Sequence, residues 1–133
     1  MEIKEYRKYC EEEMLRLYAS VGWTAYTGQP EALRRGFAGS LLTLAAYEGA
    51  ELLGLIRAVG DGQTIVFVQD LLVFPEYQRR GIGSALLRAV LKRYENVRQI
   101  MLATDDTPKT KAFYRSMGLR ELSEIGCCGF MRI

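Results

Sequence analysis

The sequence predicts an α/β (α+β) fold in which a mixed, mostly antiparallel central sheet is flanked by helices on both faces. Three observations in the 133 residues support this fold class. Hydrophobic stretches of strand length alternate with segments that have the apolar spacing of amphipathic helices. Three consecutive strands are separated only by tight-turn signals, which indicates an antiparallel meander. The strands after the meander are separated by helices, and strand–helix–strand units make the sheet a mixed one.

The N-terminal segments are expected to form an edge strand, a helix and a loop. Residues 3–7 have the pattern of a short strand. Residues 11–20 are predicted to be helical because their apolar side chains recur at the spacing of one helical face, and Gly22 can end this helix. The segment from Gly22 to Gly28 is expected to be a loop.

A second helix and the meander follow this loop. Pro30 is well placed in the first turn of the second helix, and Gly39 ends it. The meander strands are predicted at residues 41–47, 51–59 and 63–73, and the turns between them carry the sequences EGA and GDG. The continuous apolar character of the third strand predicts burial on both of its faces.

The C-terminal half is predicted to contain two helices and two strands. A helix over residues 84–94 places its apolar side chains on one face. A strand is expected at residues 97–104. The next helix runs from Pro108 to Met117, with Thr107 as its N-cap. Residues 127–133 are expected to form a terminal strand.

Composition narrows the function classes. The length fits one domain, residues 1–133. The charged N-terminus is unlike a signal peptide, and no apolar run approaches the ~18 residues of a membrane span, so a cytoplasmic protein without a membrane partner is expected. A net charge of +2 argues against nucleic acid as a partner.

Histidine and cysteine usage excludes further chemistry. The chain has no histidine, which rules out a Ser-His-Asp triad, a Cys-His pair and a His-ligated zinc site. An odd number of cysteines, two of them adjacent, does not form a disulfide framework, and we interpret them as small packing residues: Cys10, Cys127 and Cys128. No metal site is therefore expected.

The stretch QRRGIG lies at the turn between the third meander strand and the following helix. A helix N-terminus offers free N–H groups and a partial positive charge, and glycines let a bulky anion approach the backbone. Arg79 and Arg80 add two cations. The turn is therefore predicted to bind phosphate, with a plain turn and two solvated arginines as the alternative. It is neither a Walker loop nor a dinucleotide motif, because Leu86 stands where the latter needs its third glycine.

Two motifs together resemble the GCN5-related N-acetyltransferase family. Residues 78–83 match the signature Q/R-x-x-G-x-G/A, and AFYRSMGL, residues 112–119, is similar to A-x-x-F-Y-x-x-x-G-F in a slightly contracted form. The motifs have the family's order and spacing, and the element order matches over essentially the whole chain. The resemblance implies a GNAT-like sheet with a splayed strand pair and an acetyl-CoA-dependent N-acetyltransferase.

The resemblance also implies a set of cofactor-binding residues. The backbone of Leu72 and Val73 would pair with the pantetheine arm, and a strand N–H would polarise the acyl carbonyl. Many relatives carry an asparagine after the fifth strand that contacts the pantetheine; here Asp106 or Thr107 would take its place, with capping of the next helix as the alternative role of the acidic residues. Lys109 and Lys111 would reach the 3′-phosphate, with solvated lysines as the alternative. The signature loop would cradle the pyrophosphate of acetyl-CoA with Gln78, Arg79, Arg80, Gly81, Ile82, Gly83 and Ser84.

The catalytic candidates are Tyr114 and Asp70. Tyr114 matches the tyrosine that protonates the leaving thiolate in this family, with a half-buried helix aromatic as the alternative. Asp70 is our candidate for the base that deprotonates the acceptor amine, directly or through water. The alternative is an ordinary polar strand residue.

Trp23 and Tyr26 mark the expected acceptor side, because aromatic rings can hold a cationic or apolar amine. The alternative for Trp23 is that it anchors the loop in the core. The stretch LYASVGWTAY, residues 17–26, is similar to plastid and cyanobacterial arylalkylamine acetyltransferases, which suggests an aryl amine as the small-molecule acceptor.

Two other functions and an assembly remain as hypotheses. The fold could serve as a non-catalytic acyl-CoA sensor, or Arg79 and Arg80 could meet a nucleic-acid backbone, although the balanced charge opposes the latter. Members of the family often dimerise through sheet edges or terminal strands, so a homodimer through residues 127–130 is a further hypothesis.

Overall fold

One five-stranded sheet organises the first part of the chain. The computed structural model describes residues 1–133 and separates them into two compact units, Met1–Leu102 and Ala103–Ile133. Neighbouring strands are antiparallel except for the last pair, which is parallel. This arrangement confirms the predicted mixed, mostly antiparallel sheet. In spatial order the strands are β1 (Glu2–Glu5), β2 (Leu42–Glu48), β3 (Glu51–Gly60), β4 (Ile65–Val73) and β5 (Gln99–Leu102).

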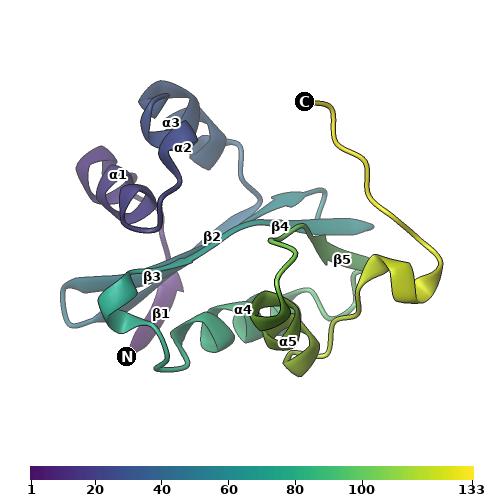
Figure 1. Ribbon diagram of the computed structural model, residues 1–133. Coiled ribbons are helices and arrows are strands. Elements are labelled where there is room, and N and C mark those ends of the chain that lie inside the picture. The colour runs from purple at the N-terminus through teal and green to yellow at the C-terminus, as the bar shows by residue number, and fades with distance from the viewer. The chain divides into compact units, whose positions relative to one another are not determined.

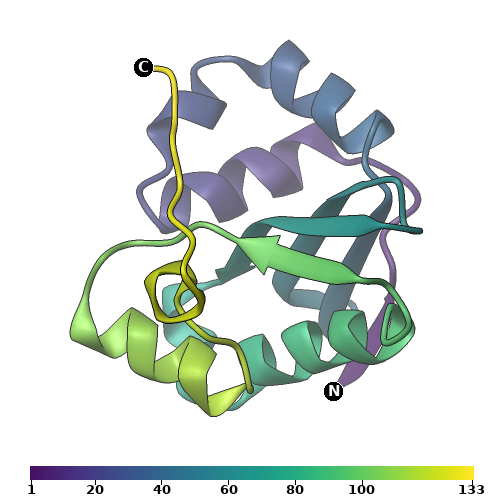
Figure 2. The ribbon, with the colours of Figure 1, turned by 90° about the vertical axis from the view of Figure 1, so that its right-hand side faces the viewer.

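Helices cover both faces of this sheet, as predicted (Figure 1). On one face lie α1 (Glu11–Ser20), α2 (Thr24–Thr27) and α3 (Pro30–Ala38), and on the other lies α4 (Ile82–Arg93). Figure 2 shows the same layers from the side. The core beneath α1 and α3 is apolar and closely packed, with Met14, Leu17, Tyr18, Leu33, Ala45, Leu52, Leu55, Leu72 and Phe74 among its buried residues. None of the helices is both long and apolar enough to cross a membrane.

The segment between α1 and α3 differs from the prediction. Residues 22–28 were expected to be a loop, but Thr24–Thr27 forms the single helical turn α2. The N–H of Gly28 donates to the carbonyl of Thr24 at 3.0 Å, which closes this turn. The turn packs the ring of Tyr26 against that of Tyr18, with 5.4 Å between centroids. Tertiary packing therefore gives structure to a segment that has little helical pattern of its own.

Strand ends and burial also differ from the predictions. β1 lies one to two residues earlier than expected, and β5 is shorter at both ends. β4 begins at Ile65 and not at Gln63. The reason is that the Asp61 carboxylate accepts hydrogen bonds from the N–H groups of Gln63, Thr64 and Ile65. Burial on both faces of β4 was wrong: buried and half-buried residues alternate along it.

The second unit contains α5 (Pro108–Ser116) and the short 3₁₀ helix η2 (Leu122–Ile125). Thr107 caps α5 as predicted, since its Oγ1 accepts a hydrogen bond from the N–H of Thr110 at 3.2 Å. The predicted terminal strand at residues 127–133 was wrong, because this segment has no regular secondary structure. A strand needs a hydrogen-bonded neighbour, and none of the chain's strands pairs with this segment, whose Phe130 is 97% exposed.

β3 and β4 approach each other closely at Gly54. A Cβ atom at this position would lie 2.6 Å from the carbonyl oxygen of Leu72, a backbone atom that has no freedom to move aside. We predict that Gly54→Ala lowers the free energy of unfolding by about 1–3 kcal/mol through this overlap. Urea unfolding followed by the fluorescence of Trp23, the single tryptophan, measures it.

Gly129→Ala is the matched control for this prediction. Gly129 has no heavy atom within 4 Å of its would-be Cβ and no positive φ, so its substitution should leave the unfolding midpoint unchanged. Equal stability of the two variants would contradict the close contact between β3 and β4.

Candidate functional site

β4 carries a strip of backbone that no strand pairs with. β5 runs beside β4 only from Ile65 to Val68, whereas β3 stays beside β4 as far as Val73. The N–H of Phe74 donates to the carbonyl of Leu53 at 3.0 Å. Alternate residues of a strand direct their polar groups to opposite sides, so Leu71 and Val73 direct theirs away from β3. The parallel pair therefore separates as the resemblance implied, and we call residues 69–73 on this side the open strip.

The register distinguishes the two strand residues that were expected to meet the pantetheine arm. The Val73 carbonyl lies on the open strip, where it accepts a hydrogen bond from Nε2 of Gln78 at 3.1 Å. The Leu72 carbonyl instead lies against Gly54 of β3, and the Leu72 side chain is buried. The register therefore favours Leu71 over Leu72 as the partner of Val73 on the open strip.

A β-bulge at Gln69 marks the start of the open strip. Arg57 of β3 pairs with Asp70 while the next residue, Ala58, pairs with Val68, so Gln69 is the extra residue in β4. Such bulges bend a strand and redirect its side chains. Here Nε2 of Gln69 donates to the phenolic oxygen of Tyr26 at 3.1 Å. The bulge therefore connects α2 to the strip.

Trp23 and Tyr26, the predicted acceptor residues, lie together beside this bulge. Their rings are 6.2 Å apart between centroids and tilted by 39°. Trp23 is 37% exposed, so it is not a core anchor, although its ring also meets that of Tyr18 edge to face. The pair presents aromatic surface next to the open strip.

Asp70 is buried in a polar cluster. Its Oδ2 accepts hydrogen bonds from the Tyr18 hydroxyl and from Nε of Arg57, each at 2.7 Å. The side chains of Arg57 and Asp70 are 7% and 0% exposed. Burial, and then the negative charge of Asp70, raise the pKa of Tyr18, so its hydroxyl remains a donor. The second carboxylate oxygen, Oδ1, is buried and has no hydrogen-bond partner.

Sequence reasoning missed the partners of Asp70. Arg57 stands within the apolar strand sequence ELLGLIRAVG, and Asp70 stands within IVFVQDLLV. A charge in a buried strand nearly always has a partner, so two opposite charges in adjacent meander strands were a usable signal. Gln69 and Tyr18 had no such signal, because the bulge and the packing of α1 define their roles.

The glycine turn forms the open N-terminus of α4. Gly81 is the N-cap with φ +78°, and the first intrahelical bond runs from the N–H of Ala85 to its carbonyl. The N–H groups of Ile82, Gly83 and Ser84 therefore have no partner within the helix. No side chain caps the helix, its first turn has no acidic residue, and a Cβ at Gly81 would meet nothing within 4 Å.

Two arginines surround this N-terminus. Arg79 has φ +67°, and no other non-glycine residue in the chain has a positive φ. Arg80 lies over the ring of Tyr77, at 5.4 Å from its centroid. The Tyr77 hydroxyl in turn donates to Oε1 of Glu51 at 2.9 Å, which fixes the 3₁₀ helix η1 (Pro75–Tyr77) to the start of β3. The turn is thus positively charged, open and rigidly attached, which suits an anion.

The remaining predicted residues belong to the second unit. Burial raises the pKa of Tyr114, and a hydrogen bond with Thr104 acts in the opposite direction. The phenol therefore keeps its proton at neutral pH. Lys111 pairs with Asp106 at 2.6 Å and with Glu121 at 3.4 Å, while Thr107 is occupied as the cap of α5. Lys111 and Thr107 thus have structural partners of their own.

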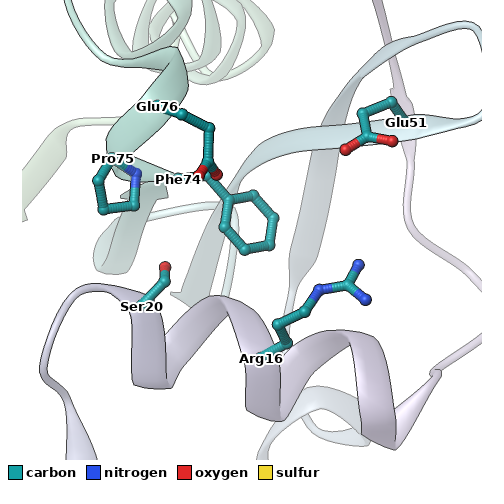
Figure 3. A pocket seen from close by; sticks show the side chains of 6 residues that line it. All are labelled: Arg16, Ser20, Glu51, Phe74, Pro75 and Glu76. Atoms are coloured by element: carbon teal, nitrogen blue, oxygen red, sulfur yellow. The ribbon is translucent and has the colours of Figure 1, made fainter.

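A shallow pocket of about 410 Å³ lies at the end of β4. Figure 3 shows Arg16 and Ser20 rising from α1 toward the ring of Phe74, the residue that follows the open strip. The Arg16 guanidinium lies 5.8 Å from the centroid of that ring. The sequence offered no motif for this pocket because its lining comes from three separate segments, with Glu51, Pro75 and Glu76 completing it.

Comparisons with known proteins agree with this architecture. A solved acetyltransferase of the GNAT family from Streptococcus pneumoniae TIGR4 is 43% identical, with a TM-score of 0.89, and the match covers 99% of this chain and 96% of that one. An aminoglycoside acetyltransferase from an uncultured soil metagenomic sample, solved with sisomicin, shares 16% identity at a TM-score of 0.73 over 99% and 95% of the two chains. At that identity the likeness shows the fold alone.

Sequence relatives point to the same family. An uncharacterised N-acetyltransferase, ycf52, from Gracilaria tenuistipitata var. liui is 27% identical over 110 residues, which are 80% of this chain and 59% of that protein. The chain spans between 42% and 60% of the length of the curated relatives it matches. The model of the acetyltransferase (GNAT) family matches residues 5–119. The chain therefore belongs to the GNAT family of acetyltransferases.

Proposed function

We propose that this protein is an acetyl-CoA-dependent N-acetyltransferase that transfers the acetyl group to a primary amine of a small molecule. The observation that carries the proposal is the open strip of β4, which leads through η1 into the uncapped, positively charged N-terminus of α4. Family membership supports acetyl-CoA as the ligand of such an arrangement.

The residues at the α4 N-terminus fit the pyrophosphate of acetyl-CoA. The free N–H groups of residues 82–84 would donate to its oxygens, and the absence of a Cβ at Gly81 leaves room for them. Arg79 and Arg80 would supply charge. On the open strip, Val73 and Leu71 would hydrogen-bond the amides of the pantetheine arm, much as a neighbouring strand would.

The reaction is direct attack of the neutral amine on the thioester carbonyl. The C–N bond forms, the C–S bond breaks, and Tyr114 gives its proton to the departing thiolate. A backbone N–H of the open strip would stabilise the negative charge that develops on the carbonyl oxygen. Asp70 would receive the proton of the amine at Oδ1, through water, because this oxygen is buried and is the one without a hydrogen-bond partner.

The acceptor side would be formed by Trp23 and Tyr26. Their aromatic surface beside the bulge suits an aryl amine. A non-catalytic acyl-CoA sensor is the second candidate, because the α4 N-terminus and the open strip would serve binding equally well without turnover. The cytoplasmic location and the homodimer stay predictions, and the segment expected to form the dimer contact is not a strand.

Acetyl-CoA binding is the first testable consequence. We predict that Gly81→Asp weakens acetyl-CoA binding at least tenfold by calorimetry, about 1.4 kcal/mol, because a carboxylate would stand among the N–H groups that face the pyrophosphate. Aspartate is a good N-cap and tolerates the left-handed conformation, so the fold should survive. Gly49→Asp, at φ +60° in the β2–β3 turn, is the matched control. Equal affinities of the two variants would contradict the assignment.

Turnover separates the enzyme from the sensor. We predict that Tyr114→Phe lowers kcat by roughly 10²-fold or more and leaves acetyl-CoA affinity unchanged, because the thiolate then lacks its proton donor. A thiol-release assay against arylalkylamines, polyamines, amino acids, aminoglycosides and short peptides measures it. Tyr94→Phe, on the α4 C-cap, should behave like the unaltered protein. A full rate in Tyr114→Phe would remove Tyr114 from the mechanism.

Asp70→Asn tests the proposed base. The amide oxygen can replace Oδ2 as the acceptor for Tyr18 and Arg57, while the NH₂ group replaces the unpartnered Oδ1. We predict a fall in kcat of about 10²-fold with unchanged acetyl-CoA affinity, because the variant keeps the geometry but cannot take up the proton. Circular dichroism checks the fold, and a kcat within twofold of the original would show that another group or water is the base.

A further inference from the structure

The ion pair of Arg57 and Asp70 stands at an unusual place in the sheet. Both side chains are almost completely buried, and they face each other across β3 and β4 at the last regular pair before the Gln69 bulge. A buried ion pair is a weak source of stability, because removing two charges from water cancels most of their attraction. Two apolar side chains would stabilise the same contact at least as well. Stability therefore does not explain the ion pair, and we look for its role in the geometry that it imposes.

Arg57 connects three elements in a fixed geometry. Its Nε donates to Oδ2 of Asp70 on β4, while Nη1 donates to the Gly36 carbonyl at 3.2 Å and to Ser40 Oγ at 3.1 Å, at the end of α3. Its guanidinium carbon also lies 5.2 Å from the ring centroid of Phe37. The planar guanidinium makes these bonds from one rigid fork, which a lysine ammonium does not reproduce.

These contacts orient Asp70 and, through it, the aromatic residues of the acceptor side. Because Arg57 and Tyr18 both use Oδ2, the carboxylate turns its other oxygen away from them, and Oδ1 has no partner. Tyr18 packs edge to face on Trp23 and Tyr26, and Tyr26 accepts the hydrogen bond from Gln69. The contacts therefore link Arg57 to both the bulge and the aromatic pair.

We propose that Arg57 is a positioning residue for acetyl transfer, which fixes the Asp70 carboxylate and the Gln69 bulge without touching either substrate. This rests on the proposed function. The side chains that hydrogen-bond Asp70 are Tyr18 from α1 and Arg57 from β3, and of these two only Arg57 is positively charged. None of the hydrogen bonds of Arg57, and not its ion pair, involves the N-terminus of α4.

The test compares Arg57→Met, Arg57→Lys and the control Arg88→Met, an exposed arginine of α4. Each is assayed well below its own unfolding temperature, so that a purely structural role would leave the rates intact. We expect Arg57→Met to lower kcat at least tenfold and to raise KM for the amine. Acetyl-CoA affinity should change less than twofold. Arg57→Lys should recover only part of kcat, because it restores the charge but not the fork.

Trp23 fluorescence supplies a readout that does not depend on turnover. Its emission should change in both Arg57 variants and not in Arg88→Met, because the aromatic pair follows Tyr18 and Asp70. Wild-type kcat and emission in Arg57→Lys would overturn the proposal, as would a parallel loss of acetyl-CoA affinity and kcat. If Arg57→Met does not fold, Arg57→Lys decides. If the unaltered protein acetylates no amine, the proposed function fails and the positioning role in acetyl transfer is overturned with it, whereas unchanged emission in both Arg57 variants of an active protein overturns the positioning role alone.

Discussion

The separation of β4 from β5 after Val68 is the constraint on which the rest of the structure depends. A strand in the middle of a sheet has neighbours on both sides, yet the last five residues of β4 have only β3. Other contacts hold these residues in place: the close approach at Gly54, the ion pair of Arg57 with Asp70, and the η1 turn fixed to Glu51. Each of these contacts lies on the β3 side of β4 or at the end of β4, so the opposite side of the strand stays open.

The surroundings of this strand differ in character from one end to the other. Near the bulge lie aromatic rings and a buried carboxylate, whereas past Val73 the chain enters a turn with two arginines and a helix N-terminus. The net charge of +2 conceals this local contrast. An elongated ligand with an anionic end and an acyl end would have its anionic end at the arginines and its acyl end at the aromatic rings and the carboxylate. One continuous segment of backbone carries both of these surroundings.

Short sequence patterns predicted those structural features that depend only on residues nearby in the chain. The helices α1, α3 and α4 follow from apolar periodicity and from their proline and glycine ends, and the N-cap Thr107 follows from its capping chemistry. Features that depend on which distant segments pack together could not be predicted from these patterns. The Gln69 bulge, the alternating burial of β4 and the choice of Leu71 over Leu72 all follow from register with β3. Residues 127–133 show the converse, since a β-rich sequence forms no strand without a partner.

The open strip has a consequence for the lifetime of the protein. Unpaired strand backbone is a template to which any extended chain can add, and proteins usually shield it. A ligand that lies along the strip removes the template and stabilises the folded state by mass action. If acetyl-CoA is that ligand, its concentration affects the lifetime of the folded protein as well as the rate of acetyl transfer. The ligand-free protein is exposed to aggregation and proteolysis, and the protein with bound acetyl-CoA is protected from both.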